Sequence, residues 1–153
     1  MSITSVRPAM SADAAPAAAI LRAWIEETDW LPDIHPPDSA EPFIAAKIAQ
    51  GGVLVAEAAG SVAGFLAREG AEISCLYVAG RARDGGLGAL LLDAAKAARP
   101  GGLWLWTFVA NAGARRFYDR HGFRDIGGTS GENEEGLPDR RLHWPGASAG
   151  RED

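Results

Sequence analysis

The sequence predicts an α/β fold, in which a mixed central sheet of about six to seven strands is flanked by about four helices. Short β-branched and aromatic runs alternate with alanine- and leucine-rich segments of helical length. The alternation is not strict, because three strand-like runs follow one another within residues 53–78. A chain of 153 residues fits one domain with a sizeable core. We assign residues 1–145 to that domain and expect residues 146–153 to be a disordered tail.

The first fifty residues predict a strand, two helices and an irregular connection between the helices. Ser11 and Asp13 are typical of a helix start and precede an alanine-rich segment. Three prolines interrupt the connection, since proline lacks a backbone donor and breaks a helix. Asp38 and Glu41 have the spacing of a capping box. The predicted elements are a strand over residues 3–6, a helix over residues 11–27, an irregular segment over residues 28–37 and a helix over residues 38–50.

The remaining residues predict a hairpin and two alternations of strand and helix. Ala59 and Gly60 form a turn between two apolar runs, which is typical of a β-hairpin. The run that begins at Leu103 is apolar at successive positions and predicts a central strand. Asn111 is a helix cap, and Gly122 stands where that helix would end. The predicted elements are strands over residues 53–57, 61–67, 72–78, 103–109, 123–126 and 140–144, a helix that ends near residue 100 and a helix over residues 111–121.

A glycine-rich loop stands between a predicted strand and a predicted helix. Its residues are Arg83, Asp84, Gly85, Gly86, Leu87 and Gly88, followed by Ala89. Glycine permits backbone angles closed to other residues and lets a ligand approach the main chain, so several amide N–H groups can point at one anion. The following helix adds the positive end of its dipole. The loop therefore predicts a binding site for the pyrophosphate of a cofactor, with a purely structural turn as the alternative.

The sequence also argues against several functions. The loop lacks the spacing of the dinucleotide fingerprint, and no Gly-Lys-Ser/Thr is present. A net charge of −5 disfavours binding to nucleic acid or to anionic membranes. No apolar run is long enough to span a bilayer and no signal peptide is visible, so we expect a cytoplasmic protein. His121 and His143 lack metal-ligand spacing, and Cys75 is the single cysteine, so we expect neither a metal site nor an internal disulfide.

Two motifs follow one another along the chain, each after a predicted strand. The first is the loop pattern of Arg83, Gly86 and Gly88. The second lies on the later helix and at the strand after it, and consists of Asn111, Ala114, Phe117, Tyr118, Gly122 and Phe123. A short loop pattern alone is weak, but two patterns in this order are specific. Together they resemble the GNAT superfamily of N-acetyltransferases over nearly the whole chain.

This resemblance implies that the cofactor is acetyl-CoA and that the fourth and fifth strands splay apart. The pantetheine arm of acetyl-CoA would lie between them, and a backbone N–H near Tyr77 would bind the developing oxyanion. Asp84 departs from the glycine common in the family at that position. The residues that the resemblance assigns to the cofactor are Leu76, Tyr77, Val78, Arg83, Asp84, Gly85, Gly86, Leu87, Gly88, Ala89, Asn111, Ala114 and Phe117.

The resemblance suggests two catalytic residues. The hydroxyl of Tyr118 would donate a proton to the leaving thiolate, and the alternative is a tyrosine that only packs in the core. Glu72 is our candidate general base, because it begins the fourth strand and would share a face with Leu76 and Val78. An expected acid is replaced by Ser74. The alternative for Glu72 is an exposed glutamate at a strand start.

The acceptor site is predicted in the irregular connection over residues 28–37. Trp30 and His35 lie there, and an imidazole titrates near neutrality, although a surface histidine is the alternative. The acidic segment near the C-terminus would attract a cationic amine or would be only a solvated loop. Its residues are Glu132, Asn133, Glu134, Glu135 and Asp139.

The predicted function is therefore transfer of acetyl from acetyl-CoA directly to a primary amine of a small molecule or peptide. A non-catalytic acyl-CoA sensor is the alternative. The sequence does not identify the acceptor, since specificity in such a scaffold depends on variable loops. An exposed edge at residues 140–144, with Trp144, would suit a homodimer.

Overall fold

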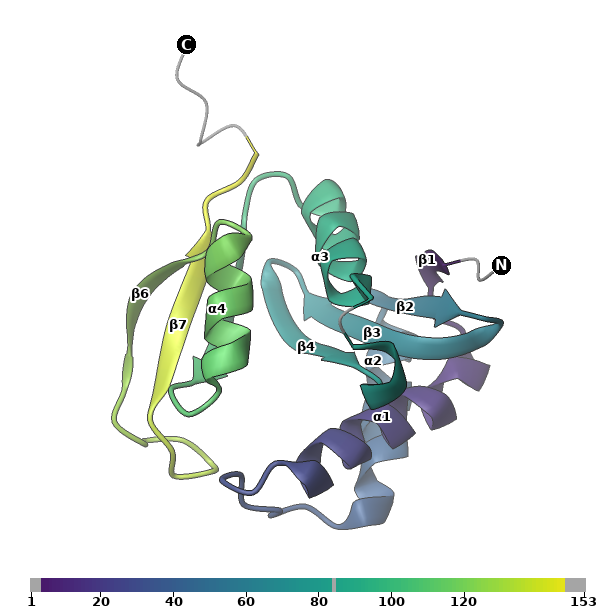
Figure 1. Cartoon of the computed structure of the whole chain (residues 1–153), viewed down its shortest axis with the longest axis horizontal. Helices are drawn as coiled ribbons and strands as arrows, with labels where there is room; N and C mark the ends of the chain where they lie inside the picture. The colour runs from purple at the N-terminus through teal and green to yellow at the C-terminus, as the bar shows by residue number, and fades with distance from the viewer. Residues whose placement is uncertain (1–3, 84, 148–153) are drawn as a thin grey trace.

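The computed structural model describes residues 4–83 and 85–147, and within them seven strands form one mixed sheet (Figure 1). The strand order is β1-β2-β3-β4-β5-β7-β6, and every neighbouring pair is antiparallel except β4 with β5. The strands are β1 (Thr4–Pro8), β2 (Val53–Ala58), β3 (Ser61–Glu69), β4 (Glu72–Val78), β5 (Leu103–Phe108), β6 (Arg124–Thr129) and β7 (Asp139–Trp144). The α-helices are α1 (Ala14–Glu27), α2 (Ala40–Gln50), α3 (Leu87–Ala98) and α4 (Ala112–Arg120).

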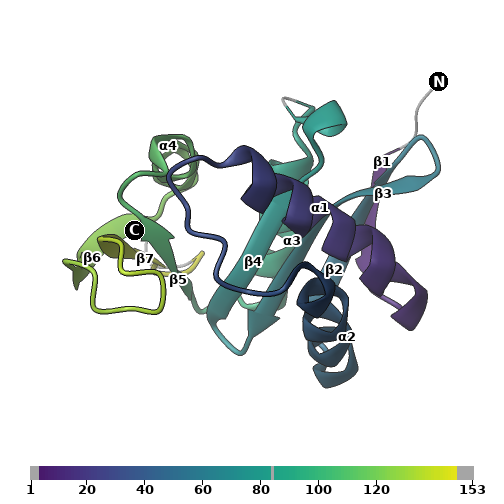
Figure 2. The ribbon, with the colours of Figure 1, turned by 90° about the horizontal axis from the view of Figure 1, so that it is seen from below.

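The helices cover the two faces of the sheet in pairs (Figure 2). One apolar cluster places α1 and α2 on one face of β2, β3 and β4, around Phe65 and Ile44. A second cluster joins α3 and α4 to the opposite face, where Leu91, Leu105 and Tyr118 are buried together. Burial of such side chains is the main force that holds the layers together.

Strands β4 and β5 pair only at their first residues and then separate. The register pairs are Glu72 with Trp104 and Ile73 with Leu105. Beyond Ile73 the two strands diverge, and the ribbon opens between β4 and α4 (Figure 1). The predicted splay of the fourth and fifth strands is therefore confirmed.

A β-bulge at Ser74 changes which side chains share a face of β4. Ala67 pairs with Cys75 and Arg68 with Ile73, so Ser74 is an extra residue in the ladder. Ile73, Leu76 and Val78 accordingly pack on the α3 side, while Cys75 and Tyr77 pack against α1. The expectation that Glu72 shares a face with Leu76 and Val78 was wrong, since one inserted residue reverses the alternation of side chains.

Most predicted elements are confirmed, with small shifts at their ends. The hairpin turns at Ala59 and Gly60, both with positive φ. The capping box at Asp38 and Glu41 is absent, because residues 37–39 form a 3₁₀ turn and the helix begins at Ala40 without a side-chain cap. Strand β5 lies inside the sheet but is not buried on both faces, since Trp106 is 43% exposed.

The C-terminal residues differ from expectation in two respects. Strand β7 is not an exposed edge, because it pairs with β5 on one side and β6 on the other, and Trp144 is buried. The prediction of an exposed edge there is therefore wrong, and the homodimer itself stays a prediction. Of the predicted tail, Gly146 and Ala147 follow the sheet, and the Ala147 N–H donates to the carbonyl of Pro100 at 3.0 Å. Residues 148–153 lie outside the described part of the chain.

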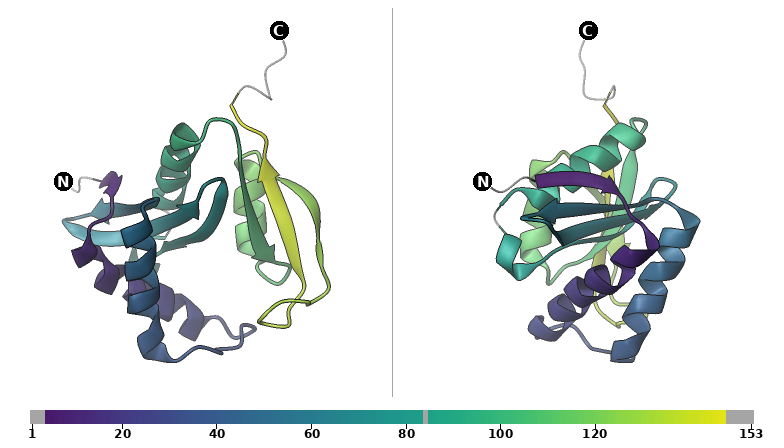
Figure 3. Two further views of the ribbon diagram at one scale, coloured as in Figure 1. Left: turned by 180° about the vertical axis from the view of Figure 1, so that it is seen from behind. Right: turned by 90° about the vertical axis from the view of Figure 1, so that its right-hand side faces the viewer.

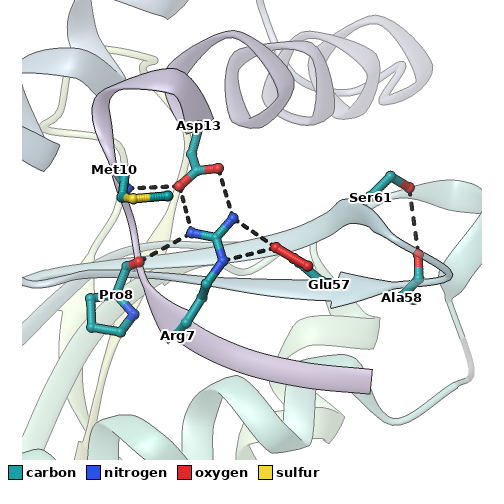
Figure 4. A network of polar contacts seen from close by, with 7 residues as sticks. All are labelled: Arg7, Pro8, Met10, Asp13, Glu57, Ala58 and Ser61. Carbon is teal, nitrogen blue, oxygen red and sulfur yellow. Dashed lines mark hydrogen bonds and ion pairs between the residues drawn. The ribbon is translucent and has the colours of Figure 1, made fainter. Parts of the chain in front are cut away.

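A polar network fixes the N-terminal strand to the first helical segment (Figure 4). The Arg7 guanidinium donates to both carboxylate oxygens of Asp13, at 2.8 and 3.0 Å, and to Glu57 at 2.8 Å. The backbone N–H of Met10 also donates to Asp13, at 2.7 Å. The guanidinium of Arg7 holds the pKa of the buried Asp13 carboxyl below its usual 3.8.

Replacement D13N is expected to lower the free energy of unfolding by about 2 kcal/mol at pH 7. This change is smaller than the full cost of breaking a buried ion pair, because Arg7 is partly exposed. Since the pKa of Asp13 is lower in the folded state, its contribution is present above about pH 4 and is lost as the pH falls further. Urea unfolding of wild type and D13N at pH 7 and pH 2.5 measures this, and the two curves should differ less at the lower pH. The control is D33N, which breaks a similar but exposed pair with Arg22 and should change stability by less than about 1 kcal/mol.

Candidate functional site

A cleft of about 1000 Å³ opens where β4 separates from β5. Its walls are the C-terminal end of α1, the end of β4, the glycine loop with the start of α3, and α4. The lining includes many of the residues predicted from the two motifs. Those residues are Trp30, Leu76, Tyr77, Val78, Arg83, Gly86, Leu87, Gly88, Ala89, Asn111, Ala114, Phe117 and Tyr118.

The glycine loop forms an open cradle at the start of α3. Gly86 is the N-cap residue and has φ +81° and ψ 8°, a left-handed conformation that favours glycine. A Cβ at Gly86 would meet no protein atom within 4 Å, so the space above it is free. The N–H groups of Leu87, Gly88 and Ala89 lie in the first turn of the helix, where no intrahelical acceptor exists. These groups suit a pyrophosphate.

The other two predicted loop residues have different positions. The N–H of Gly85 donates to the carbonyl of Ala82 at 3.3 Å, so it is already used within the turn. Asp84 lies outside the described residues. The prediction that these two residues contact the cofactor therefore remains a prediction.

Arg83 reaches across the cleft to α1. Its guanidinium forms an ion pair with Glu27, and its Nε donates to the carbonyl of Val78 at 3.3 Å. Glu27 was not predicted as a site residue, because nothing in the sequence relates the end of the first helix to the loop more than fifty residues later. In this structure one arginine connects the helix, the glycine loop and the edge of β4.

The free edge of β4 offers backbone groups to a ligand. The N–H of Ala79 donates to the carbonyl of Ala63 at 2.7 Å, which makes these residues a hydrogen-bonded pair with β3. Because bonded and non-bonded pairs alternate in an antiparallel ladder, Tyr77 also bonds toward β3, and the N–H groups of Leu76 and Val78 face the gap toward β5. The N–H groups on either side of Tyr77 therefore face the gap, and their role as oxyanion donors stays a prediction.

Helix α4 forms the opposite wall. Asn111 caps this helix as predicted, since its Oδ1 accepts from the N–H of Ala114 at 3.1 Å. The ring of Phe117 lies against the glycine loop, where a Cβ on Gly88 would come within 3.4 Å of it. That distance is an ordinary van der Waals contact, so the ring of Phe117 packs directly over the start of α3.

Tyr118 stands between the cleft and a smaller inner cavity of about 100 Å³. The residue is 8% exposed and packs edge-on against Phe117 and Phe123, with ring centroids 5.2 and 5.3 Å away. Burial raises the pKa of Tyr118 well above its usual range, so its phenol stays protonated near neutral pH. Both alternatives for Tyr118 are therefore compatible, since it packs in the core and also lines the site.

Aromatic rings line the inner cavity. Trp24 contacts Tyr77 and Trp30, with centroid distances of 5.0 and 6.2 Å, and Trp30 contacts Phe108 at 5.8 Å. These rings connect β4, the loop after α1 and β5 across the gap. The cavity also includes Ser74 and Trp106. The sequence alone does not show that the first helix, which carries Trp24, ends beside the gap.

Glu72 and His35 are not brought to the cleft. Glu72 lies at the paired end of β4, five residues before Tyr77, which is roughly 16 Å along an extended strand. His35 is exposed, and its Nε2 lies 2.7 Å from Glu134. This contact joins the loop after α1 to the loop between β6 and β7, which meet in Figure 3.

Most of the acidic segment is engaged in contacts of its own. Asp139 accepts from Thr129 and from Asn133, and the Asn133 side chain also bonds both backbone groups of Leu137. Glu132 accepts from Ser130. Burial is the main cause that raises the pKa of the Tyr77 phenol, and Cys75, Tyr118 and Glu135 act in the same direction. The segment is thus an ordered loop whose polar groups bond largely to one another.

The part of the chain that the structure describes contains neither a metal-ligand cluster nor a helix that could span a membrane. Within residues 4–83 and 85–147, no three His, Cys, Asp or Glu side chains gather as metal ligands would. Over the same residues, no helix is long and apolar enough to cross a membrane. Cys75 is buried, and burial raises the pKa of its thiol to about 11.

The fold and this cleft agree with comparisons to known proteins. The Acetyltransferase (GNAT) family profile matches residues 10–123, and the chain belongs to this family. GNAT acetyltransferases use acetyl-CoA, and the cradle, the free edge of β4 and the α4 wall are of a kind to hold it. No curated protein sequence matches the chain.

Solved structures of the same fold cover nearly the whole chain. A GNAT family acetyltransferase from Bacillus cereus ATCC 10987 has a TM-score of 0.79 at 18% identity, covering 95% of this chain and 99% of its own. A GCN5-related N-acetyltransferase from Rhodopseudomonas palustris has a TM-score of 0.77 at 25% identity, covering 95% and 97%. The acetyltransferase yncA from Salmonella typhimurium, solved with acetyl-CoA, has a TM-score of 0.74 at 20% identity, covering 99% and 98%.

Proposed function

We propose that this acetyltransferase transfers acetyl directly from acetyl-CoA to a primary amine held in the inner cavity. The observation that carries the proposal is the meeting of cleft and inner cavity at shared residues, among them Leu76, Asn111 and Tyr118. A thioester in the gap and an amine among the aromatic rings would therefore face each other without a covalent enzyme intermediate. Bound acetyl-CoA would supply the acetyl thioester, whose C–S bond breaks as the amine forms the new C–N bond.

The side chains and backbone of this chain would act at three points. The N–H groups of Leu76 and Val78 would stabilise negative charge on the carbonyl oxygen. The phenol of Tyr118, kept protonated by burial, would give its proton to the departing sulfur. The amine would lose its proton through water to acids at the rim, Glu27 and Asp29, which line the cleft, rather than to Glu72.

The test is isothermal titration with acetyl-CoA, together with a free-thiol release assay over a panel of amino acids, polyamines, aminoglycosides and short peptides. Binding with thiol release for one class of amine is the expected result. Binding without release for any amine would contradict the transfer proposal and support the sensor alternative. Absence of acetyl-CoA binding would contradict the assignment of the cleft.

A further inference from the structure

The side chain of Arg83 bonds two walls of the cleft at once. Its guanidinium pairs with the carboxylate of Glu27 at the end of α1, and its Nε donates to the carbonyl of Val78 on β4 at 3.3 Å. All three residues line the cleft. Arg83 also stands three residues before Gly86, the N-cap of the cradle. The side chain therefore occupies part of the cleft between the glycine loop and α1.

The carbonyl of Val78 belongs to the open edge of β4. In the antiparallel ladder with β3, Tyr77 bonds toward β3, and the backbone groups of Val78 point the other way, into the gap. Since β5 pairs with β4 only as far as Ile73, this edge is open to a ligand. A ligand that pairs with the edge as a strand would needs both the N–H and the carbonyl of Val78. The carbonyl becomes accessible only when Arg83 leaves it.

Glu27, the other partner of Arg83, lies on the side of the cleft where the amine is proposed to bind. Trp24 stands three residues earlier on α1, and residues at this spacing share a face of a helix. Trp24 lines both the cleft and the inner cavity, and its ring centroid is 5.0 Å from that of Tyr77. The last turn of α1 therefore presents both side chains to the site. In this structure the carboxylate of Glu27 is engaged by a guanidinium instead of a substrate.

We infer that Arg83 exchanges partners when acetyl-CoA binds: its guanidinium leaves Glu27 and Val78 and pairs with the pyrophosphate. The freed carboxylate of Glu27 then takes up, through water, the proton that leaves the amine nitrogen. The inference rests on the proposed function and names the proton acceptor within it. A guanidinium binds phosphate in the same forked geometry as carboxylate, so one anion replaces another. The existing pair is readily given up, because its side chains are 43% and 45% exposed and such pairs contribute little to stability.

Calorimetric titration with free CoA tests the exchange without turnover, using wild type, E27Q, R83Q and the double variant. E27Q should bind CoA about three-fold more tightly, since Arg83 then has no ion pair to give up. R83Q should raise the Kd about 10-fold, and adding E27Q to R83Q should change nothing further. The controls E26Q and R81Q remove the same charges from residues that bond elsewhere and do not line the cleft, so their Kd should equal that of wild type.

Thiol release with the amine that wild type uses tests the freed carboxylate. E27Q should lower kcat about 10-fold while KM for acetyl-CoA falls, a loss below that of a sole general base because Asp29 also lines the cleft. E26Q should change neither quantity. An unchanged kcat in E27Q would overturn the role of its carboxylate.

The affinities separate the inference from the proposed function. Equal tightening by E27Q with and without Arg83 would show only charge repulsion and would overturn the exchange, and so would an affinity in E27Q that is unchanged or weaker. Either result would leave the transferase intact. Coupled affinities without thiol release from any amine would support the exchange and contradict the transferase.

Discussion

Replacement Y118F is expected to lower kcat by about 100-fold while the affinity for acetyl-CoA stays within two-fold of wild type, a loss typical of a missing general acid. The reason is that phenylalanine keeps the ring contacts with Phe117 and Phe123 and removes only the proton donor. Because burial raises the pKa of Tyr118, the activity of the wild type should show no loss from its deprotonation up to about pH 10. Single-turnover thiol release and titration with acetyl-CoA give the two quantities.

The control for this variant is Y77F. Tyr77 has a buried phenol in the same cavity but lies on β4, against α1. The Y77F variant should reduce kcat by far less than Y118F if the proton comes from the phenol of Tyr118 on α4. Equal losses in the two variants, or an unchanged kcat in Y118F, would remove Tyr118 from the mechanism.

Replacement G86A should raise the Kd for acetyl-CoA by about 30-fold, which corresponds to about 2 kcal/mol and to the loss of a charge-assisted hydrogen bond. A Cβ at this position meets no protein atom within 4 Å, so it would project into open space at a residue that lines the cleft. The left-handed backbone at φ +81° adds a strain of roughly 1 kcal/mol to the folded state. Calorimetric titration measures the affinity, and chemical unfolding measures the strain.

The matched control is G60A in the hairpin turn. Gly60 has φ +82°, and a Cβ there also meets nothing within 4 Å, so its strain should be similar. It lies away from the residues that line the cleft. G60A should therefore lose stability without losing affinity for acetyl-CoA. Weak binding in both variants would show that G86A acts through the fold rather than through the cradle.

The parts of the site that could be predicted from the sequence are those whose residues lie close together along the chain. The glycine loop, the Asn111 cap and the order of the strands depend on local backbone preferences, which a short motif records. The pair of Arg83 with Glu27 and the ring of Trp24 beside Tyr77 depend on where α1 ends relative to β4. No local sequence pattern determines how close the end of α1 lies to β4, so these contacts were not predicted.

The expectation for Glu72 shows the same limit of local sequence patterns. Glu72 was assigned a face from strict alternation, and the bulge at Ser74 makes that assignment wrong.

The bulge at Ser74 makes the site sensitive to chain length. One supernumerary residue turns Leu76 and Val78 so that their N–H groups face the gap, and turns Tyr77 toward α1. Loss of a single residue from β4 would restore the regular alternation of the strand. The directions of Leu76, Tyr77 and Val78 would then be exchanged, even if every side chain of the cleft were kept. Substitutions at Ser74 are therefore expected to be tolerated far better than its deletion. Homologues are expected to vary in the side chain at this position and to keep the extra residue of the bulge.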